Sequence, residues 1–169
     1  MRPSLRGMDD ELALPGWART EREVLLRFLN KMRNAVVRTS EGLSDNELRT
    51  PRVPSGTNLL GLIKHLTWCE ELWFQRVFLD QEITSDESMV VPAELTRDDV
   101  VAAYRRACER SDEIIRDCAD LSTSATAAHD GEDLRMPLRV ITAHMIEETG
   151  RHAGHADILR EQIDGRTES

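Results

Sequence analysis

Four side chains in the segment 144–155 have the types and spacing of metal ligands. If the segment is helical, His144, Glu148 and His152 recur every four residues, and His155 follows three residues later. Residues three or four apart lie on one helical face, so three imidazoles and a carboxylate line a single stripe. Imidazole nitrogen and carboxylate oxygen bind zinc and similar ions at about 2.0–2.2 Å. The spacing therefore predicts a divalent metal centre on this helix.

A complete centre needs a ligand from a second helix, and His65 is the candidate. It lies in an apolar stretch, 59–66, and is expected to face the core. Three protein ligands leave one coordination position open, as in catalytic rather than structural metal sites. The alternative for His65 is a packed core histidine, and the alternative for Glu148 is an exposed face where it pairs with Arg151. The residues alone leave these alternatives open.

The other polar candidates are assigned less specific roles. His155 is a fourth ligand or a base beside the metal, depending on small rotations of the helix. Cys69 lies one turn after His65 and could reach the same cavity, although a buried free cysteine is more often a packing residue. His129 lies in a polar loop and is expected to be solvated. The sequence contains no serine nucleophile elbow, glycine-rich phosphate loop or Cys/His nucleophile pair.

Four long helices must position these residues. Thr20 and Glu23 form a capping box before the first helix, which Gly42 ends. The later helices are predicted from Thr57 or Asn58 to about 79, from the N-cap Thr96 to about 119, and from Pro137 at N1 to about 163. A short extra turn is expected near 44–47, and no segment has the pattern of a strand. The fold class is all-α, a four-helix bundle whose topology the link lengths leave open.

Composition limits the partners and the compartment. The 169 residues include 22 Lys and Arg against 31 Asp and Glu, a net charge of −9. This balance argues against nucleic acid or an anionic membrane as partner. Three widely spaced cysteines and the lack of an 18-residue apolar run favour a cytoplasmic protein. We expect a partly flexible lead-in over 1–16 and one domain over 17–165. The aromatic residues of 68–78 favour a homodimer.

Three blocks of the sequence resemble the DinB/YfiT-like metalloenzyme superfamily, and more closely an actinobacterial DinB-like branch. The blocks are 41–48, 58–74 and 144–165, and the third, which contains the histidine stripe, is the most specific. The resemblance implies an up-down-down-up bundle with a crossover between the second and third helices. It also implies a metal held by His65, Glu148 and His152. A glutamate at the first position of the last pair is similar to the mycothiol-dependent maleylpyruvate isomerases.

The same resemblance implies a function. Relatives of this kind use the metal to bind a low-molecular-weight thiol, such as mycothiol, and catalyse S-transfer to an electrophilic substrate or thiol-assisted isomerisation. Zinc is the expected metal, with nickel, manganese and iron as alternatives, and Arg151 is a candidate contact to the thiol. Two other functions stay open: a metal-dependent hydrolase with His155 as base, and a non-enzymatic, stress-associated metal-binding bundle.

Overall fold

The computed structural model describes residues 20–126 and 135–167, so the predicted lead-in over 1–16 and His129 lie outside the described residues. The helices, in chain order, are α2 (Glu21–Arg38), α3 (Asp45–Arg49), α4 (Leu59–Glu70), η1 (Glu71–Phe78), α5 (Arg97–Asp117) and α6 (Leu138–Asp164). Within the described ranges there is no strand, only an isolated bridge between Ser124 and Pro137. The all-α prediction is confirmed.

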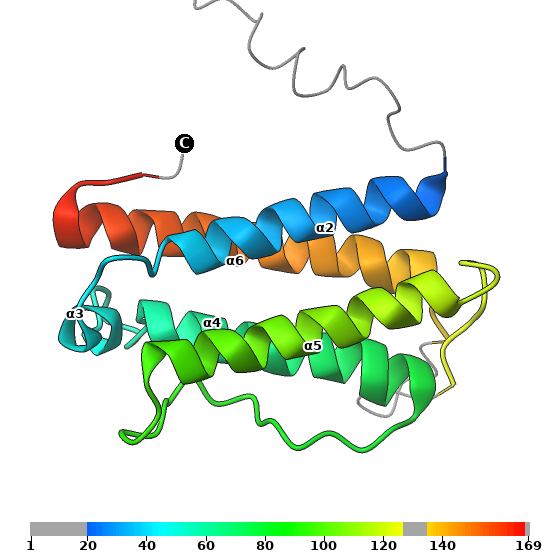
Figure 1. Cartoon of the computed structure of the whole chain (residues 1–169), viewed down its shortest axis with the longest axis horizontal. Coiled ribbons are helices and arrows are strands. Elements are labelled where there is room, and N and C mark those ends of the chain that lie inside the picture. The colour runs from blue at the N-terminus through cyan, green and yellow to red at the C-terminus, as the bar shows by residue number, and fades with distance from the viewer. Residues whose placement is uncertain (1–19, 127–134, 168–169) are drawn as a thin grey trace, which may run out of the picture.

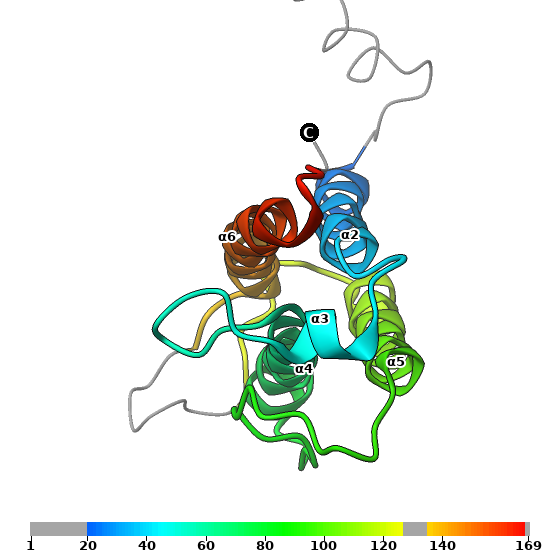
Figure 2. The same cartoon turned by 90° about the vertical axis from the view of Figure 1, so that its left-hand side faces the viewer.

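The long helices pack as a bundle. In Figure 1 the chain runs from right to left along α2 and α6, and from left to right along α4 and α5. Figure 2 shows the bundle end-on, with α6 next to α2 on one side and to α4 on the other. In the part of the chain that is described, no helix is long and apolar enough to cross a membrane.

The helix starts follow from local capping. Thr20, Ser44 and Thr96 each accept a hydrogen bond from the backbone N–H three residues on, within a complete capping box. Asn58 caps α4 by accepting from the Gly61 N–H at 2.9 Å. Pro137 differs from expectation, because it occupies the N-cap position of α6 instead of N1. The short turn predicted near 44–47 is present as α3.

The second long helix changes its winding halfway along. Residues Leu59–Glu70 are α-helical, and Glu71–Phe78 continue as a π-helix. The apolar pattern predicted one helix to about 79, and it gives no sign of this change. Trp73 lies on the π-helical part, and its ring meets the ring of His144 on α6 at 4.6 Å.

A buried ionic cluster joins α2 to α4 and α5. The guanidinium of Arg33, 3% exposed, donates to both carboxylate oxygens of Glu70 at 2.7 and 2.6 Å and to Asp112 at 2.6 Å. Asn30 accepts from Arg33 and donates to Asp112. Glu70 is fully buried, so the carboxylate depends on this guanidinium to offset its desolvation. The helical stripe of apolar residues did not predict the cluster.

The segment 80–95, which we call the crossover, returns along the outer face of α4 (Figure 1). The Lys64 ammonium donates to the Asp86 carboxylate at 2.7 Å and to the Ser88 carbonyl at 2.6 Å. The crossover backbone also lies directly on Gly61, where a Cβ would be 2.5 Å from the Met89 carbonyl oxygen. Only a glycine allows this approach. These contacts hold the crossover beside the helix that carries His65.

Candidate metal centre

The structure brings His65 from α4 together with Glu148 and His152 from α6. Oε1 of Glu148 lies 2.9 Å from Nε2 of His152 and 3.9 Å from Nε2 of His65. One ligand atom from each of the three residues lies within 4.8 Å of the others. Two helices thus supply two nitrogens and one oxygen to one point. The i, i+4 spacing of Glu148 and His152 brings their side chains to the same face of α6.

The donor set fits a divalent metal. Ligand atoms about 2.0–2.2 Å from a tetrahedral zinc ion are about 3.4 Å apart. This value lies between the 2.9 and 3.9 Å that separate Oε1 of Glu148 from the two imidazole nitrogens. The three side chains are only 12–13% exposed, so they are shielded from water without being sealed from it. Nδ1 of His65 is buried and has no hydrogen-bond partner among the described residues. The group can therefore hold a metal ion.

Burial keeps the imidazoles of the centre neutral. Desolvation, together with the neighbouring His65 and His155, lowers the pKa of His152 to about 4. Desolvation also lowers the pKa of His65, although the backbone and the carboxylate of Glu87 partly offset the effect. A neutral imidazole has a free lone pair, which is the form that binds a metal. Both histidines are therefore in the protonation state that a metal site requires.

Arg151 and His155, both on α6, contact the candidate ligands Glu148 and His152. Arg151 pairs with Oε2 of Glu148 and lies 3.5 Å from the Glu147 carboxylate. Nδ1 of His155 lies 3.4 Å from Nδ1 of His152, on the ring nitrogen opposite to the one that faces Glu148. Both side chains are exposed at the surface. Arg151 therefore contacts the Glu148 oxygen, and His155 the His152 nitrogen, that is not directed at the other candidate ligands.

Cys69 and Trp68 lie on the α4 side of the centre. Sγ of Cys69 is 3.4 Å from Nε2 of His65, and the ring of Trp68 is 5.6 Å from the His65 ring. Burial raises the pKa of the Cys69 thiol to about 12. The thiol is therefore a neutral, poorly nucleophilic group in this environment. The sequence-based preference for packing as its role stays a prediction.

His144 is separate from the three ligands, although it belongs to the same stripe. Its ring meets the Trp73 ring edge-to-face at 4.6 Å, and Nδ1 lies 3.8 Å from the Glu147 carboxylate. Among the described residues, the group that could hold a metal ion consists of His65, Glu148 and His152. Four candidates on one face therefore separate into a pair of converging candidate ligands, a histidine edge-to-face with Trp73, and His155 behind His152.

The sequence reasoning missed the contribution of the crossover. Glu87 lies close enough to His65 and Cys69 for its charge to act on both. The path of this segment was unpredictable from its polar composition. The signal that could have placed it is Gly61, one turn before His65, because a glycine inside an apolar helix often marks a close backbone contact.

The fold and the converging residues define a helical-bundle protein with a His/Glu/His group suited to a divalent metal. The family model described as mycothiol-S-transferase matches residues 24–165, which is most of the chain. The chain therefore belongs to the mycothiol-S-transferase family, as the resemblance to the DinB/YfiT-like superfamily indicated. Comparisons with curated proteins and with solved structures gave no match.

Proposed function

We propose that this protein is a metal-dependent S-transferase that joins a low-molecular-weight thiol of the mycothiol type to an electrophilic small molecule. The observation that carries the proposal is the convergence of His65, Glu148 and His152 within 4.8 Å. Membership of the mycothiol-S-transferase family supports the thiol as one substrate. The metal would be zinc, or otherwise nickel, manganese or iron, held by these three residues.

A divalent ion bound there would lower the pKa of a coordinating thiol, so that the thiol reacts as a thiolate at neutral pH. The residues of the chain orient this centre. Arg151 holds the second oxygen of Glu148, which leaves Oε1 directed at the two histidines. His155 fixes the ring of His152 through the Nδ1 contact. Both act as positioning residues, and Arg151 is also a candidate contact to the thiol substrate.

The reaction is a nucleophilic displacement or addition. The thiolate sulfur forms a bond to an electrophilic carbon, and the leaving group departs with its electron pair, or an electron-deficient double bond takes up the pair and then a proton. The thiol proton passes to solvent, which reaches the centre because its three side chains are each 12–13% exposed. In the isomerase form of the reaction, the thiolate adds to a double bond of the substrate. The substrate then rotates about the resulting single bond, and the thiolate leaves again.

The arrangement favours thiol transfer over hydrolysis with His155 as base. A general base must reach the attacking water at the open position. His155 contacts the outer nitrogen of His152, whereas the ligand atoms converge on the opposite nitrogen. We therefore assign His155 to orientation of His152 and not to proton abstraction.

Three expectations accompany the proposal. The up-down-down-up topology is supported by the helix directions in Figure 1. A homodimer is supported by Trp68 and Trp73, which are half-buried on the second long helix although Phe74 and Phe78 fill the core beside them. The cytoplasmic location is supported by the three free cysteines.

The test is an S-transfer assay with mycothiol and a fluorogenic electrophile. We expect metal-loaded protein to accelerate loss of the thiol, chelation to abolish the rate, and added zinc to restore it. The Glu148→Ala/His152→Ala variant should stay inactive after zinc is added, and the matched His144→Ala variant should stay active. A rate that is independent of metal would contradict the proposal.

A further inference from the structure

Part of the crossover runs extended alongside α4. At one end Ser85 donates its hydroxyl to Oε2 of Glu71 at 2.6 Å. At the other end the Met89 carbonyl oxygen lies where a Cβ on Gly61 would be 2.5 Å away. The helix rises about 15 Å from Gly61 to Glu71, and extended chain covers about 13 Å from Ser85 to Met89. The two lengths agree, so the segment 85–89 lies antiparallel to these turns of α4.

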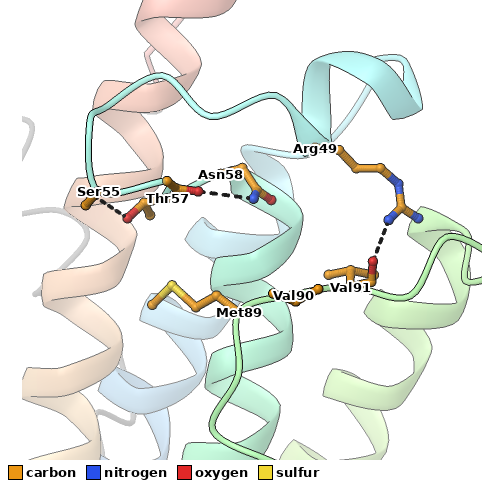
Figure 3. Close-up of a pocket in the computed structure, with 8 residues that line it drawn as sticks. Arg49, Ser55, Thr57, Asn58, Met89, Val90 and Val91 are labelled. Atoms are coloured by element: carbon orange, nitrogen blue, oxygen red, sulfur yellow. Dashed lines mark hydrogen bonds between the residues drawn. The ribbon is translucent and has the colours of Figure 1, made fainter.

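The next part of the crossover is held by α3. Figure 3 shows Met89, Val90 and Val91 beside the first turns of α4. The Val91 carbonyl accepts a hydrogen bond from the Arg49 guanidinium at 3.0 Å, and the Pro92 carbonyl accepts another at 3.3 Å. The crossover is therefore fixed to the bundle on both sides of its contact with Gly61.

Lys64 holds the middle of the segment 85–89. Its ammonium donates to the Asp86 carboxylate at 2.7 Å and to the Ser88 carbonyl at 2.6 Å. The Ser88 N–H donates to the same carboxylate at 2.8 Å, which closes a turn around Glu87. The backbone of Glu87 is thus fixed from both sides by the residue that precedes His65.

The ring of His65 has a buried nitrogen that the metal centre does not use. Nε2 lies 3.9 Å from Oε1 of Glu148, whereas Nδ1 is buried and has no hydrogen-bond partner among the described residues. Burial lowers the pKa of His65, and the Glu87 backbone opposes this shift, as a carbonyl oxygen facing a ring N–H does. A metal-bound imidazole generally donates its other N–H to a carboxylate, a backbone carbonyl or water.

We propose that Lys64 positions the Glu87 carbonyl to accept the Nδ1–H of His65 in the metal-bound protein. This hydrogen bond fixes the tautomer in which the Nε2 lone pair is free for the metal. Lys64 and Glu87 are thus positioning residues, and neither contacts the metal. The inference rests on the metal centre of the proposed function and adds the element that orients its α4 ligand.

The first test is zinc affinity, measured by competition with a chromogenic chelator. Lys64→Met removes a positive charge, which by itself should strengthen cation binding. We expect binding about tenfold weaker instead, because His65 loses its fixed acceptor. Lys64→Arg retains donors for the crossover and should bind zinc more tightly than Lys64→Met.

The matched control is Arg106→Met, because Arg106 is an exposed cation on α5 that lines one cavity with Lys64. It should bind zinc at least as tightly as wild type. Gly61→Ala displaces the crossover at a second point and should also weaken zinc binding. Thermal unfolding of the metal-free variants checks that the bundle is intact.

Side-chain NMR spectra of the zinc-loaded, nitrogen-labelled protein identify the tautomer directly. Wild-type His65 should be protonated at Nδ1, and this proton should exchange with water faster in Lys64→Met. Glu87→Gln keeps the backbone carbonyl, so the proton should exchange as slowly as in wild type. Equally fast exchange in Glu87→Gln and Lys64→Met would assign the acceptor to the carboxylate and overturn the inference.

Two further outcomes separate this inference from the proposed function. Zinc binding by Lys64→Met that equals or exceeds that of wild type would overturn the inference, and so would a zinc-bound His65 protonated at Nε2. Both results would leave the S-transferase proposal standing. Wild-type protein that binds no divalent metal would refute both proposals.

Discussion

Oε1 of Glu148 lies between two imidazoles, 2.9 Å from Nε2 of His152 on its own helix and 3.9 Å from Nε2 of His65 on α4. The first distance follows from i, i+4 helical geometry. The second depends on how α4 and α6 pack, because residues far apart in the chain meet there. The centre therefore depends on the whole bundle as well as on the helix that carries two of its ligands.

The ligand assignment predicts the metal content of variants. Purified wild-type protein should contain about one divalent ion per chain, because three ligands converge at one point. Glu148→Ala/His152→Ala should contain almost none, whereas His144→Ala should retain the wild-type content. Elemental analysis measures both. Equal losses in the two variants would show that His144 is also a ligand.

Burial of His152 predicts how the metal-free protein responds to acid. The pKa of His152 is about 4 in the folded chain, against about 6.5 for an unperturbed histidine. As the pH falls from 6.5 to 4, the unfolded chain takes up the proton first, so the free energy of unfolding decreases. Above pH 6.5 His152 is neutral in both the folded and the unfolded chain, so the free energy of unfolding no longer decreases through its protonation.

Urea unfolding of chelator-treated protein at several pH values measures this slope. In His152→Gln the slope over pH 4–6.5 should be smaller than in wild type, and the part that remains should include His65 and His144, whose pKa values are also lowered. An identical slope in the two proteins would contradict the assignment of a neutral, buried His152.

Removing Glu70 should destabilise the bundle strongly. Glu70→Ala leaves the buried Arg33 guanidinium without its bidentate partner, which costs about 3–5 kcal/mol in comparable buried pairs. Glu113→Ala removes an exposed pair with Arg110 and should cost less than about 1 kcal/mol. Urea unfolding distinguishes them, and similar losses in the two variants would refute a special role for the buried cluster.

Replacing glycine by alanine should have opposite effects on stability at Gly61 and at Gly154. Gly61→Ala places a Cβ 2.5 Å from the Met89 carbonyl, so the crossover must shift, at a cost of about 1–3 kcal/mol. Gly154→Ala meets no atom within 4 Å inside α6 and should stabilise the protein by about 0.5–1 kcal/mol. Thermal unfolding measures whether each variant is less or more stable than wild type. Proteolysis within 80–95 should increase only in Gly61→Ala.

The sequence predicted the parts of this structure that depend on local physics. Capping at Thr20 and Thr96 and the one-face placement of Glu148 and His152 follow from residues a few positions apart. The π-helical winding of 71–78, the Arg33 cluster and the path of the crossover were missed. Each depends on contacts between distant segments, which helical periodicity does not encode.

The most direct measurement of the central claim is the absorption spectrum of cobalt-substituted protein during titration with mycothiol. If the thiol binds at the centre formed by His65, Glu148 and His152, a sulfur-to-cobalt charge-transfer band should grow to one equivalent. Glu148→Ala/His152→Ala should show no such band. A cobalt spectrum that mycothiol leaves unchanged, with the ion still bound to the wild-type protein, would contradict the account.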